Sequence, residues 1–535
     1  MISKRTPETK NPNEASLRSL QVLEKLEVGP VQVKRRQIQS PYTVTQKSGI
    51  SAFNLTYHFE EDVLDPSDPI SVNLASMIMA QVAINYGLFF EEIVFHDTLD
   101  AVDQRFIKDM MINTAREIYV VKFLGPNPFL IGDAAALPLE KKDTYLQARL
   151  LFPRKTSDFP SADKISRSQP WSTDKNRHAV LSSGGKDSLL SFGLLKEIGK
   201  NVHPIFINES GRHWYTALNG YRYSAANYPE TSKVWTNADR LFAWMLRRFP
   251  FVRQDFAQIR SDDYPIRLWT VAVFLFGALP LLKKRGIGRL VIGDEYDSTN
   301  RTSYKGITHY NGLYDQSRYF DRAMTRYFFK KGWEVSQFSI LRPLSELLIE
   351  KTLYERYPIL QSNQVSCHAA HIEENRVYPC GKCEKCRRIV GMLKALDGDP
   401  TNCGYTKAQI QYCLRELLVK GVHQESAGAQ HLFYLLEEKG LFEKGPKGSG
   451  SHPRPEITKI RFDPKKSPFA TTPTDLRKPL FEIYLTHAAG AAKRIAGLWT
   501  DFNPLEDPAL VSPFLPEDPQ NLNNESSEET FTQEC

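Results

Sequence analysis

Apolar residues recur along this chain in two patterns, as short continuous runs and at the three-to-four-residue spacing of helices. Between residues 178 and 293 the two patterns alternate. Such alternation predicts an α/β fold, in which a parallel sheet carries helices on both faces. The predicted strands are 178–182, 202–208 and 289–293, and the predicted helices are 189–198, 237–249 and 267–284.

The pattern ahead of this region predicts different organisation. Residues 1–40 are polar and charged, and we expect a mobile arm there. Residues 41–152 mix strand and helix patterns without a chemical motif, so they are predicted to form a separate, accessory α+β domain. Its predicted strands are 53–59, 92–96 and 119–124, and its predicted helices are 71–86 and 100–117. A linker rich in Ser, Asp, Lys and Pro follows at 155–175.

The main domain is expected to span 175–400, followed by a helical extension at 401–440, where leucines at 407–438 have helical spacing. After it the chain becomes rich in Lys, Pro, Gly and Ser and then acidic. We therefore expect residues 441–535 to be a largely disordered tail, with one short helix near 480–498.

Bulk properties narrow the class of protein. With 535 residues, two or three domains are expected. The longest apolar run, 269–282, contains Pro280 and is too short to span a bilayer, and the polar N-terminus is no secretory signal. A cytoplasmic protein without membrane contact is expected. The formal net charge is +7 although residues 501–535 are acidic, so the remaining chain is basic and suits anionic ligands such as ATP.

One loop carries the clearest chemistry. Six residues join the predicted strand 178–182 to the predicted helix 189–198: Ser183, Gly184, Gly185, Lys186, Asp187 and Ser188. Glycines let the backbone approach phosphate oxygens, serine hydroxyls add donors, and the helix start offers free N–H groups. The Walker A motif is a poor match, because Val180 replaces its first glycine and Asp187 follows the lysine. An ordinary glycine turn with a serine helix cap is the structural alternative.

This segment resembles the SGGxDS loop of the PP-loop ATP pyrophosphatases, with the adenine nucleotide alpha hydrolase-like fold. The resemblance implies cleavage of ATP between the α and β phosphates and transfer of AMP to a substrate. Ser183, Gly184, Gly185 and Ser188 would hold the departing pyrophosphate, Lys186 would neutralise it, and Asp187 would cap the helix or help to hold Mg²⁺.

Two further polar segments follow predicted strands, at the sheet edge where ligands of such folds lie. Asn208, Glu209 and Ser210 would border the nucleotide, or simply form a turn. Asp294 and Glu295 could bind Mg²⁺ or act as a general base, with helix capping as the alternative. Beyond them an aromatic and basic stretch could recognise an anionic or planar substrate or simply pack. That stretch comprises Tyr304, Lys305, His309, Tyr310, Arg318 and Tyr319. Arg342 could clamp a carboxylate, with a surface salt bridge as the alternative.

Four cysteines gather near residue 380. Cys380, Cys383 and Cys386 are each separated by two residues, and Cys367 precedes them by thirteen. Four thiolates complete the tetrahedral shell of a structural Zn²⁺. An iron–sulfur cluster is the less favoured occupant, and free thiols are the structural alternative. His368 or His371 could replace Cys367, whereas Cys403, Cys413 and Cys535 fit no ligand spacing.

The loop and the cysteines together resemble the 7-cyano-7-deazaguanine synthases, which adenylate a carboxylate and convert it with ammonia to an amide and then a nitrile. The chain departs from that family in the longer spacing before its cysteine triad, in the segment ahead of the loop and in the tail. The run 339–347 with the same cysteines also looks like the ATP-dependent UDP-N-acetylmuramoyl-L-alanyl-L-glutamate epimerase. There a glycine usually stands in place of Ser183, and the motif around Asp294 differs.

These resemblances imply an enzyme that uses ATP and Mg²⁺ to activate a small-molecule carboxylate and releases AMP and pyrophosphate. Amide or nitrile formation is the preferred second step, and epimerisation is the alternative. A tRNA-modifying PP-loop enzyme would use the basic body to bind RNA, and a nucleotide sensor without catalysis is a third reading. A homodimer is compatible with each of them.

Overall fold

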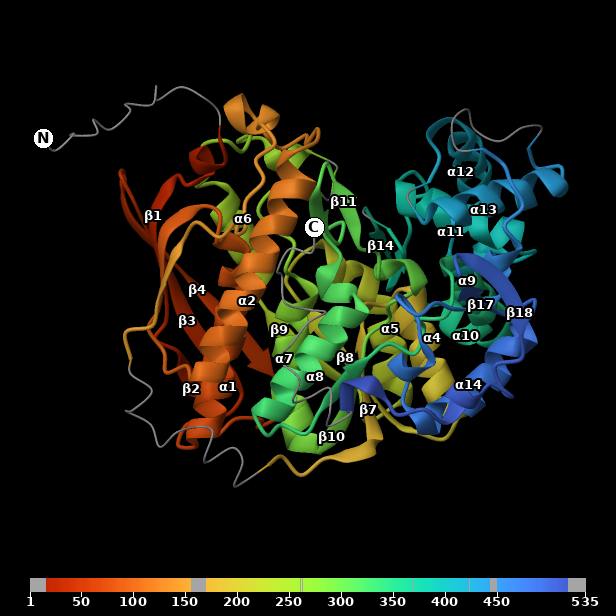
Figure 1. The fold of residues 1–535 in the computed structure, drawn as a ribbon, viewed down its shortest axis with the longest axis horizontal. Helices are drawn as coiled ribbons and strands as arrows, with labels where there is room; N and C mark the ends of the chain where they lie inside the picture. Colours follow the sequence, from red (N-terminus) through yellow and green to blue (C-terminus); the bar gives the residue numbers. More distant parts are fainter. Residues whose placement is uncertain are drawn as a thin grey trace, which may run out of the picture.

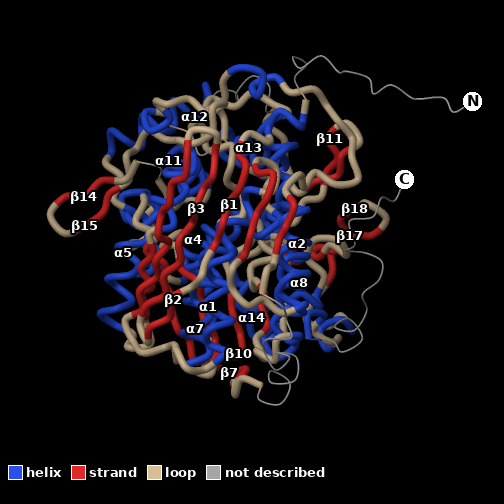
Figure 2. The backbone as a smooth tube through the Cα atoms, turned by 90° about the vertical axis from the view of Figure 1, so that its left-hand side faces the viewer, coloured by secondary structure: helices blue, strands red, loops and turns tan. Residues whose placement is uncertain are grey.

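The computed structural model describes residues 16–154, 170–259, 261, 263–367, 369–422, 424–442 and 450–517. Within these residues one mixed sheet of eleven strands runs through the molecule (Figure 1; strands red in Figure 2). Its strands are β1 (Leu23–Val28), β2 (Gln32–Lys34), β3 (Gln37–Gln46), β4 (Gly49–Phe59), β5 (Phe90–Phe95), β6 (Arg149–Leu151), β7 (Asp174–Ser182), β8 (Asn201–Asn208), β9 (Ser232–Thr236), β10 (Ile287–Val291) and β13 (Ser336–Phe338). The strand order is β13-β10-β7-β8-β9-β4-β3-β1-β5-β6, and β2 pairs with β3.

Parallel pairing dominates the half of the sheet that carries the glycine loop. Strands β13, β10, β7, β8 and β9 are all parallel, whereas β9, β4, β3 and β1 pair antiparallel, and β1, β5 and β6 are again parallel. The α/β prediction is therefore confirmed as a mixed, mostly parallel sheet. Residues expected in strands at 178–182, 202–208 and 53–59 lie in β7, β8 and β4.

Helices cover both faces of the parallel half. The helices are α1 (Pro69–Ala80), α2 (Ala101–Ile118), α4 (Lys186–Glu197), α5 (Arg212–Asn227), α6 (Ala238–Leu246), α7 (Val271–Arg285), α8 (Arg318–Lys330), α9 (Glu346–Arg356), α10 (Pro358–Gln361), α11 (Glu384–Ala395), α12 (Lys407–Lys420), α13 (Ser426–Glu438) and α14 (Thr474–His487). Ala179 of β7 packs in the core that α1, α2 and α7 share, whereas Val180 packs in the core of α4, α9 and α14. Successive strand residues point to opposite faces, so β7 is buried on both sides.

Short strands form three smaller sheets in the described residues. The hairpins are β11 (Thr302–Tyr304) with β12 (Ile307–His309) and β14 (His371–Glu373) with β15 (Arg376–Tyr378). Strands β16 (Ile460–Phe462), β17 (Ala491–Ile495) and β18 (Leu498–Phe502) form the third. In Figure 1 strands β1, β3 and β4 lie at the left and helices α11, α12 and α13 at the right.

The predicted arm is wrong for its described part. Strand β1 lies between β3 and β5 inside the sheet, and it buries Leu26 and Val28. The sparse apolar residues of this segment suffice because strand pairing satisfies the backbone and places alternate side chains in the core. Residues 1–15 lie outside the described residues.

Residues 41–152 do not form a separate domain. Strand β4 pairs antiparallel with β9, so the main sheet continues across the expected boundary. Tyr57 of β4 donates a hydrogen bond to the Val273 carbonyl of α7 at 3.5 Å, and both residues lie in the same core. The strand predicted at 119–124 is also wrong, because Tyr119–Phe123 continues α2 as one π-helical turn. This segment is buried by helix packing, which the period of its apolar residues did not distinguish.

Much of the expected tail is folded. Residues 450–517 contain β16, α14, β17 and β18, and α14 buries Leu480, Phe481 and Tyr484 in the core of α4 and α9. The helix expected at 480–498 starts and ends earlier, and residues 491–495 form a strand instead. The prediction failed because α14 is stabilised by contacts with distant helices, which composition does not reveal. The rest of the tail, 443–449 and 518–535, lies outside the described residues.

The helical extension is present but is not a separate unit. Helices α12 and α13 agree with the leucine spacing at 407–438, with a break between residues 420 and 426. Both pack against α11, which carries a candidate metal ligand. The predicted linker at 155–175 lies mostly outside the described residues, and its last two residues begin β7.

Candidate active site and metal centre

The glycine loop connects the carboxyl end of β7 to the start of α4, as the sequence predicts. Ser182 ends β7, and Lys186 is the first residue of α4. Gly184 has a φ of +71°, and a Cβ there would lie 2.6 Å from the Thr216 carbonyl oxygen of α5. A Cβ at Gly185 would have Ser183 Oγ as its nearest neighbour, at 3.5 Å. Helix α5 therefore covers the loop at Gly184, whereas the space beside Gly185 is open.

The open side of this loop faces the first turn of α4. Gly185 occupies the N-cap position and has no side chain with which to cap the helix, and Ser183 is exposed. Ser188 uses its hydroxyl to donate a hydrogen bond to the Gly185 carbonyl at 3.2 Å. An uncapped helix start combines free N–H groups with the positive end of the helix dipole, which is a favourable environment for an anion.

Lys186 lies among three carboxylates. Its buried Nζ is 2.9 Å from Asp187 Oδ1, 3.1 Å from Glu295 Oε2 and 3.1 Å from Glu346 Oε1. Burial acts to lower the pKa of Lys186, but these carboxylates outweigh it and hold the pKa well above its ordinary value. The lysine is therefore a fixed positive charge at the edge of the glycine loop.

Glu295 reaches Lys186 because the segment after β10 approaches α4 closely. A Cβ at Gly293 would lie 2.7 Å from Asp187 Cβ and 2.9 Å from the Asp187 carbonyl carbon, so this approach requires glycine. Burial raises the pKa of Glu295 well above its ordinary value, and Lys186 opposes that rise. A carboxyl group with a raised pKa next to a fixed cation is a suitable proton acceptor or metal ligand.

Asp294 contacts a different set of groups. Its Oδ2 lies 3.4 Å from Arg342 Nη2, and the same Nη2 donates to Asp321 at 2.6 Å. Arg342 also donates from Nη1 to Ser298 Oγ at 2.8 Å and to the Gln316 carbonyl at 2.7 Å. Arg342 is 0% exposed, so the alternative of a surface salt bridge is wrong. Arg342 instead clamps two carboxylates of the protein itself.

Asn208, Glu209 and Ser210 lie at the carboxyl end of β8, next to β7. Asn208 Oδ1 accepts a hydrogen bond from the Ser210 N–H at 3.0 Å, and Ser210 Oγ donates to the Thr236 carbonyl at 2.8 Å. Glu209 is buried and accepts the Trp214 N–H at 3.0 Å, and burial raises its pKa. The three residues reach the predicted edge of the sheet, where their contacts build the turn into α5.

The aromatic and basic stretch beyond Asp294 mainly packs. Tyr310 is buried between Tyr314 and Tyr319, and its N–H donates to Glu117. Arg318 lies over the Tyr319 ring, 4.6 Å from its centroid. These contacts agree with the packing alternative.

The four predicted cysteines come together. Their Sγ atoms all lie within 4.8 Å of one another, with Cys383 at 3.5 Å from Cys386 and 3.9 Å from Cys367, and Cys380 at 3.8 Å from Cys386. Thiolates placed tetrahedrally at about 2.3 Å from zinc are about 3.8 Å apart. The cluster could therefore hold a metal ion such as zinc.

Local structure prepares these thiols for a cation. Cys383 is the N-cap residue of α11, and Cys386 lies in the first turn of that helix. Cys367 Sγ accepts N–H groups from Ala369 at 3.3 Å and Cys380 at 3.2 Å. Backbone donors and a helix start favour the thiolate form that binds metal.

Of the two alternative ligands, His371 does not join the cluster. His371 is exposed in β14, where its Nε2 lies 3.0 Å from Glu373, and His368 lies outside the described residues. Cys403 and Cys413 are buried elsewhere and contact the carbonyls of Gln361 and Gly381. Cys535 also lies outside the described residues.

Sequence reasoning missed the role of Glu346 and Arg388 at this site. Glu346 begins α9 and contacts Lys186, and Arg388 Nε lies 3.4 Å from Glu346 Oε1. Glu346 belongs to the run 339–347, whose expected likeness to the epimerase was the one available signal. Arg388 follows the last cysteine by two positions, and nothing in its local sequence marks it.

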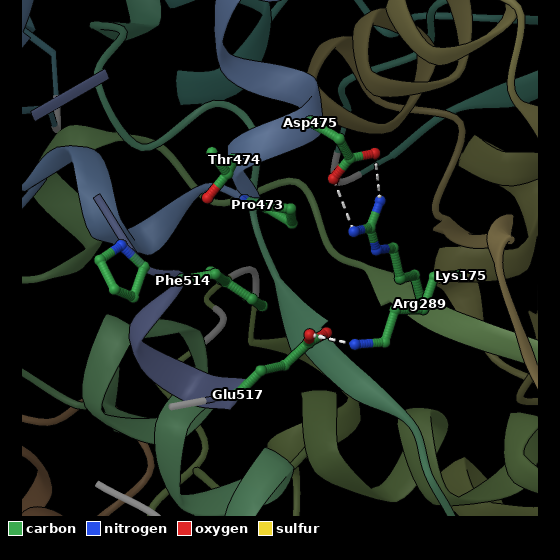
Figure 3. Close-up of a pocket in the computed structure, with 8 residues that line it drawn as sticks. Lys175, Arg289, Pro473, Thr474, Asp475, Phe514 and Glu517 are labelled. Carbon is green, nitrogen blue, oxygen red and sulfur yellow. Dashed lines mark hydrogen bonds and ion pairs between the residues drawn. The ribbon is translucent and has the colours of Figure 1, made fainter. Parts of the chain in front are cut away.

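A hollow of about 450 Å³ lies near the amino end of β7, away from the glycine loop (Figure 3). Its charged residues pair with one another, Arg289 with Asp475 at 2.7 Å and Lys175 with Glu517. Pro473, Pro513 and Phe514 line its wall. The charged side chains of the hollow are therefore already paired with one another, whereas no side chain caps the helix start at the glycine loop.

Comparison with known proteins adds no assignment: no family model matches the chain, and no curated protein sequence is significantly similar to it. In the described part of the chain, no helix has both the length and the apolar character required to cross a membrane. Function is therefore inferred from the residues of the site.

Proposed function

We propose that this protein is an ATP-dependent enzyme of the PP-loop type, which adenylates a substrate carboxylate and releases pyrophosphate. One observation carries the proposal. The open start of α4, with Gly185 and exposed Ser183, lies beside a buried Lys186 at the carboxyl edge of a mostly parallel sheet. A phosphate group bound there would meet N–H donors, hydroxyls and a fixed positive charge.

The charges around the loop also suit Mg²⁺. Mg²⁺ is generally bound by one or two carboxylates together with phosphate oxygens and water. Asp187, which is partly exposed, and Glu295 would supply these carboxylates. Asp187 and Glu295 would hold Mg²⁺, which would supply positive charge to the phosphates, while Lys186, still held by Glu346, would neutralise the leaving pyrophosphate.

In the adenylation step, one bond to the α-phosphorus forms and one breaks. A carboxylate oxygen of the substrate attacks the α-phosphorus, the bond between the α-phosphorus and the bridging oxygen breaks, and pyrophosphate leaves with that oxygen. In the preferred second step ammonia attacks the acyl-adenylate and AMP leaves, which gives an amide and, after a further activation, a nitrile. Glu295 is the group that would accept the proton released from ammonia.

Epimerisation of a glutamate-containing cell-wall precursor is the second candidate. One observation favours it: Glu346, in the run that resembles the epimerase, contacts Lys186 at 3.1 Å. In this reaction the acyl-adenylate would lose its α-proton to a base and regain it on the other face. The two candidates share the first step and differ in the product.

The four-cysteine cluster is proposed to hold Zn²⁺ as a structural site, since four thiolates leave no position for a substrate. Metal analysis of the purified protein separates zinc from an iron–sulfur cluster. Iron with visible absorbance would favour the tRNA-modifying alternative instead.

The test of the first step is formation of AMP and pyrophosphate from MgATP in the presence of a panel of carboxylic acids, followed by mass spectrometry. Asp187→Asn should lower AMP formation on the order of 100-fold, because the variant loses a Mg²⁺ ligand and charge beside the leaving group. Asp255→Asn changes an exposed aspartate that pairs with Arg253 and is the matched control.

The outcome is decisive for the site. Acid-dependent AMP formation that survives in Asp187→Asn would place catalysis elsewhere. Absence of AMP with every acid tested, although MgATP binds, would instead favour the nucleotide sensor. Circular dichroism of both variants checks that their fold is retained.

A further inference from the structure

Arg388 connects the cysteine cluster to the glycine loop. It lies in α11, two residues after Cys386, and its Nε is 3.4 Å from Glu346 Oε1 and 4.0 Å from Glu384 Oε1. Its side chain is 21% exposed, so the contact with Glu346 is shielded from much of the solvent.

Glu346 contacts Lys186 as well as Arg388. The same oxygen, Glu346 Oε1, is 3.4 Å from Arg388 Nε and 3.1 Å from Lys186 Nζ. Its side chain is 8% exposed, and Ser345 caps the start of α9 and fixes its position. A buried carboxylate that contacts two cations through one oxygen attracts both of them, because removing the carboxylate would leave buried positive charge without this partner.

Two backbone contacts lead from the cysteine segment to the loop by separate routes. Asn219 of α5 exchanges hydrogen bonds with Val377 of β15 at 2.9 and 3.0 Å, and α5 closes over Gly184. Val365, two residues before Cys367, donates its N–H to the Gly184 carbonyl at 3.4 Å. The segment that holds the four thiols therefore contacts the loop through side chains and backbone (α4, α5, α9 and α11 in Figure 1).

We propose that Arg388 is a positioning residue that couples metal binding at the four cysteines to nucleotide binding at the glycine loop. The inference rests on the proposed function in that MgATP binds beside Lys186. A metal ion fixes Cys383 and Cys386, and hence the first turns of α11. Arg388 then holds Glu346, and Glu346 holds Lys186 in the position that meets the phosphates. Coupling of this kind is reciprocal, so bound nucleotide must also retain the metal.

The experiment measures the equilibrium affinity of the full-length protein for Zn²⁺ by competition with a colorimetric chelator of known affinity. Saturating MgATP should tighten zinc binding by the wild type about tenfold, within the usual range of such coupling. Arg388→Met should keep one Zn²⁺ per chain but lose this tightening. Arg388→Lys retains a cation opposite Glu346 and should restore most of it.

Controls separate coupling from general damage. Arg415→Met removes an exposed arginine from α12 of the same region and should respond to MgATP as the wild type does. Glu346→Gln removes the carboxylate charge that Arg388 and Lys186 share. MgATP should therefore not tighten zinc binding in this variant either. Chelation of zinc by free ATP cannot imitate the result, because it would act equally on every variant.

The failures can be told apart when MgATP binding is measured separately by equilibrium dialysis. If MgATP binds the wild type with no change in zinc affinity, or if Arg388→Met keeps the full tightening, the coupling is overturned while the proposed function stands. If MgATP does not bind at all, both are overturned.

Discussion

Residues that are adjacent in the sequence have different surroundings at this site. Asp294 and Glu295 are adjacent, yet Asp294 contacts Arg342 and Glu295 contacts Lys186. A pair of adjacent carboxylates in the sequence therefore corresponds to two separate electrostatic environments. Of the two, the environment at Lys186 adjoins the glycine loop.

His178 provides a titration that can be tested at the residue scale. It is fully buried in β7, with Nδ1 3.1 Å from the Asn176 carbonyl and Nε2 3.4 Å from Arg289 Nη1. Burial, with Arg289 beside it, lowers the pKa of His178 from 6.5 to about 3. Between these values the unfolded chain binds a proton that the folded protein does not, so the free energy of unfolding decreases as pH falls through this window.

His178→Asn should reduce that dependence. Between about pH 5 and 6 the slope of the free energy of unfolding against pH should fall by about 1 kcal/mol per pH unit, the contribution of nearly one proton. Urea denaturation at several pH values measures the slope. His58→Asn removes an exposed histidine of β4 and is the control. An unchanged slope in His178→Asn would show that His178 is not held neutral.

At the scale of elements, the packing of α5 on the glycine loop explains why one glycine is structural. Gly184 has a positive φ and touches the backbone of Thr216 and Ala217. Gly185 has a φ of −85° and open space beside it. The two adjacent glycines thus differ in why glycine is needed. Gly184 must be glycine because α5, which follows later in the chain, packs against it.

Substitution by alanine should separate the two. Gly184→Ala should destabilise the protein by roughly 2 kcal/mol or more, because of a strained φ and a clash with helix backbone that cannot move aside. Gly185→Ala should change stability by less than about 0.5 kcal/mol. It should still weaken MgATP binding, since the added methyl group occupies the open side.

Urea denaturation and nucleotide titration of both variants measure these effects. Equal stability of Gly184→Ala and Gly185→Ala would contradict the close packing of α5 on Gly184. Full MgATP affinity in Gly185→Ala would place the phosphates elsewhere.

At the scale of the whole molecule, residues 450–517 complete the core around the site. Arg461 is 1% exposed and forms two hydrogen bonds of 2.9 Å with Glu425. Its N–H donates to the Pro343 carbonyl at 2.8 Å, next to Arg342, and Tyr484 donates to the Ile340 carbonyl at 3.0 Å. The segment therefore supports the region from which Arg342 and Glu346 project.

Truncation after Gly450 should prevent folding. It exposes the core that Leu476, Leu480 and Phe481 now fill, and each large buried side chain is worth about 1.5–3 kcal/mol against a total stability of about 5–15 kcal/mol. Soluble yield and thermal unfolding measure the effect. Truncation after Glu517, which keeps every described element, is the control. A cooperative, soluble protein that ends at Gly450 would contradict this role.

Local sequence determined several features correctly. The glycines and serines of the loop predicted the turn between β7 and α4, because a strand, a glycine turn and a helix start are specified by neighbouring residues. The spacing of Cys380, Cys383 and Cys386 predicted their convergence, since two intervening residues span a tight turn into a helix. The alternation of apolar runs predicted the α/β class for the same local reason.

Tertiary structure decided the rest, because it depends on residues far apart in the chain. Pairing of β4 with β9 joined a supposed separate domain to the main sheet, and packing of α14 folded a segment whose composition predicts disorder. Lys186, Glu346 and Arg388 meet only where α4, α9 and α11 pack together. The sequence by itself determined the chemical groups of the loop and the cluster, while long-range packing decided which charges face them.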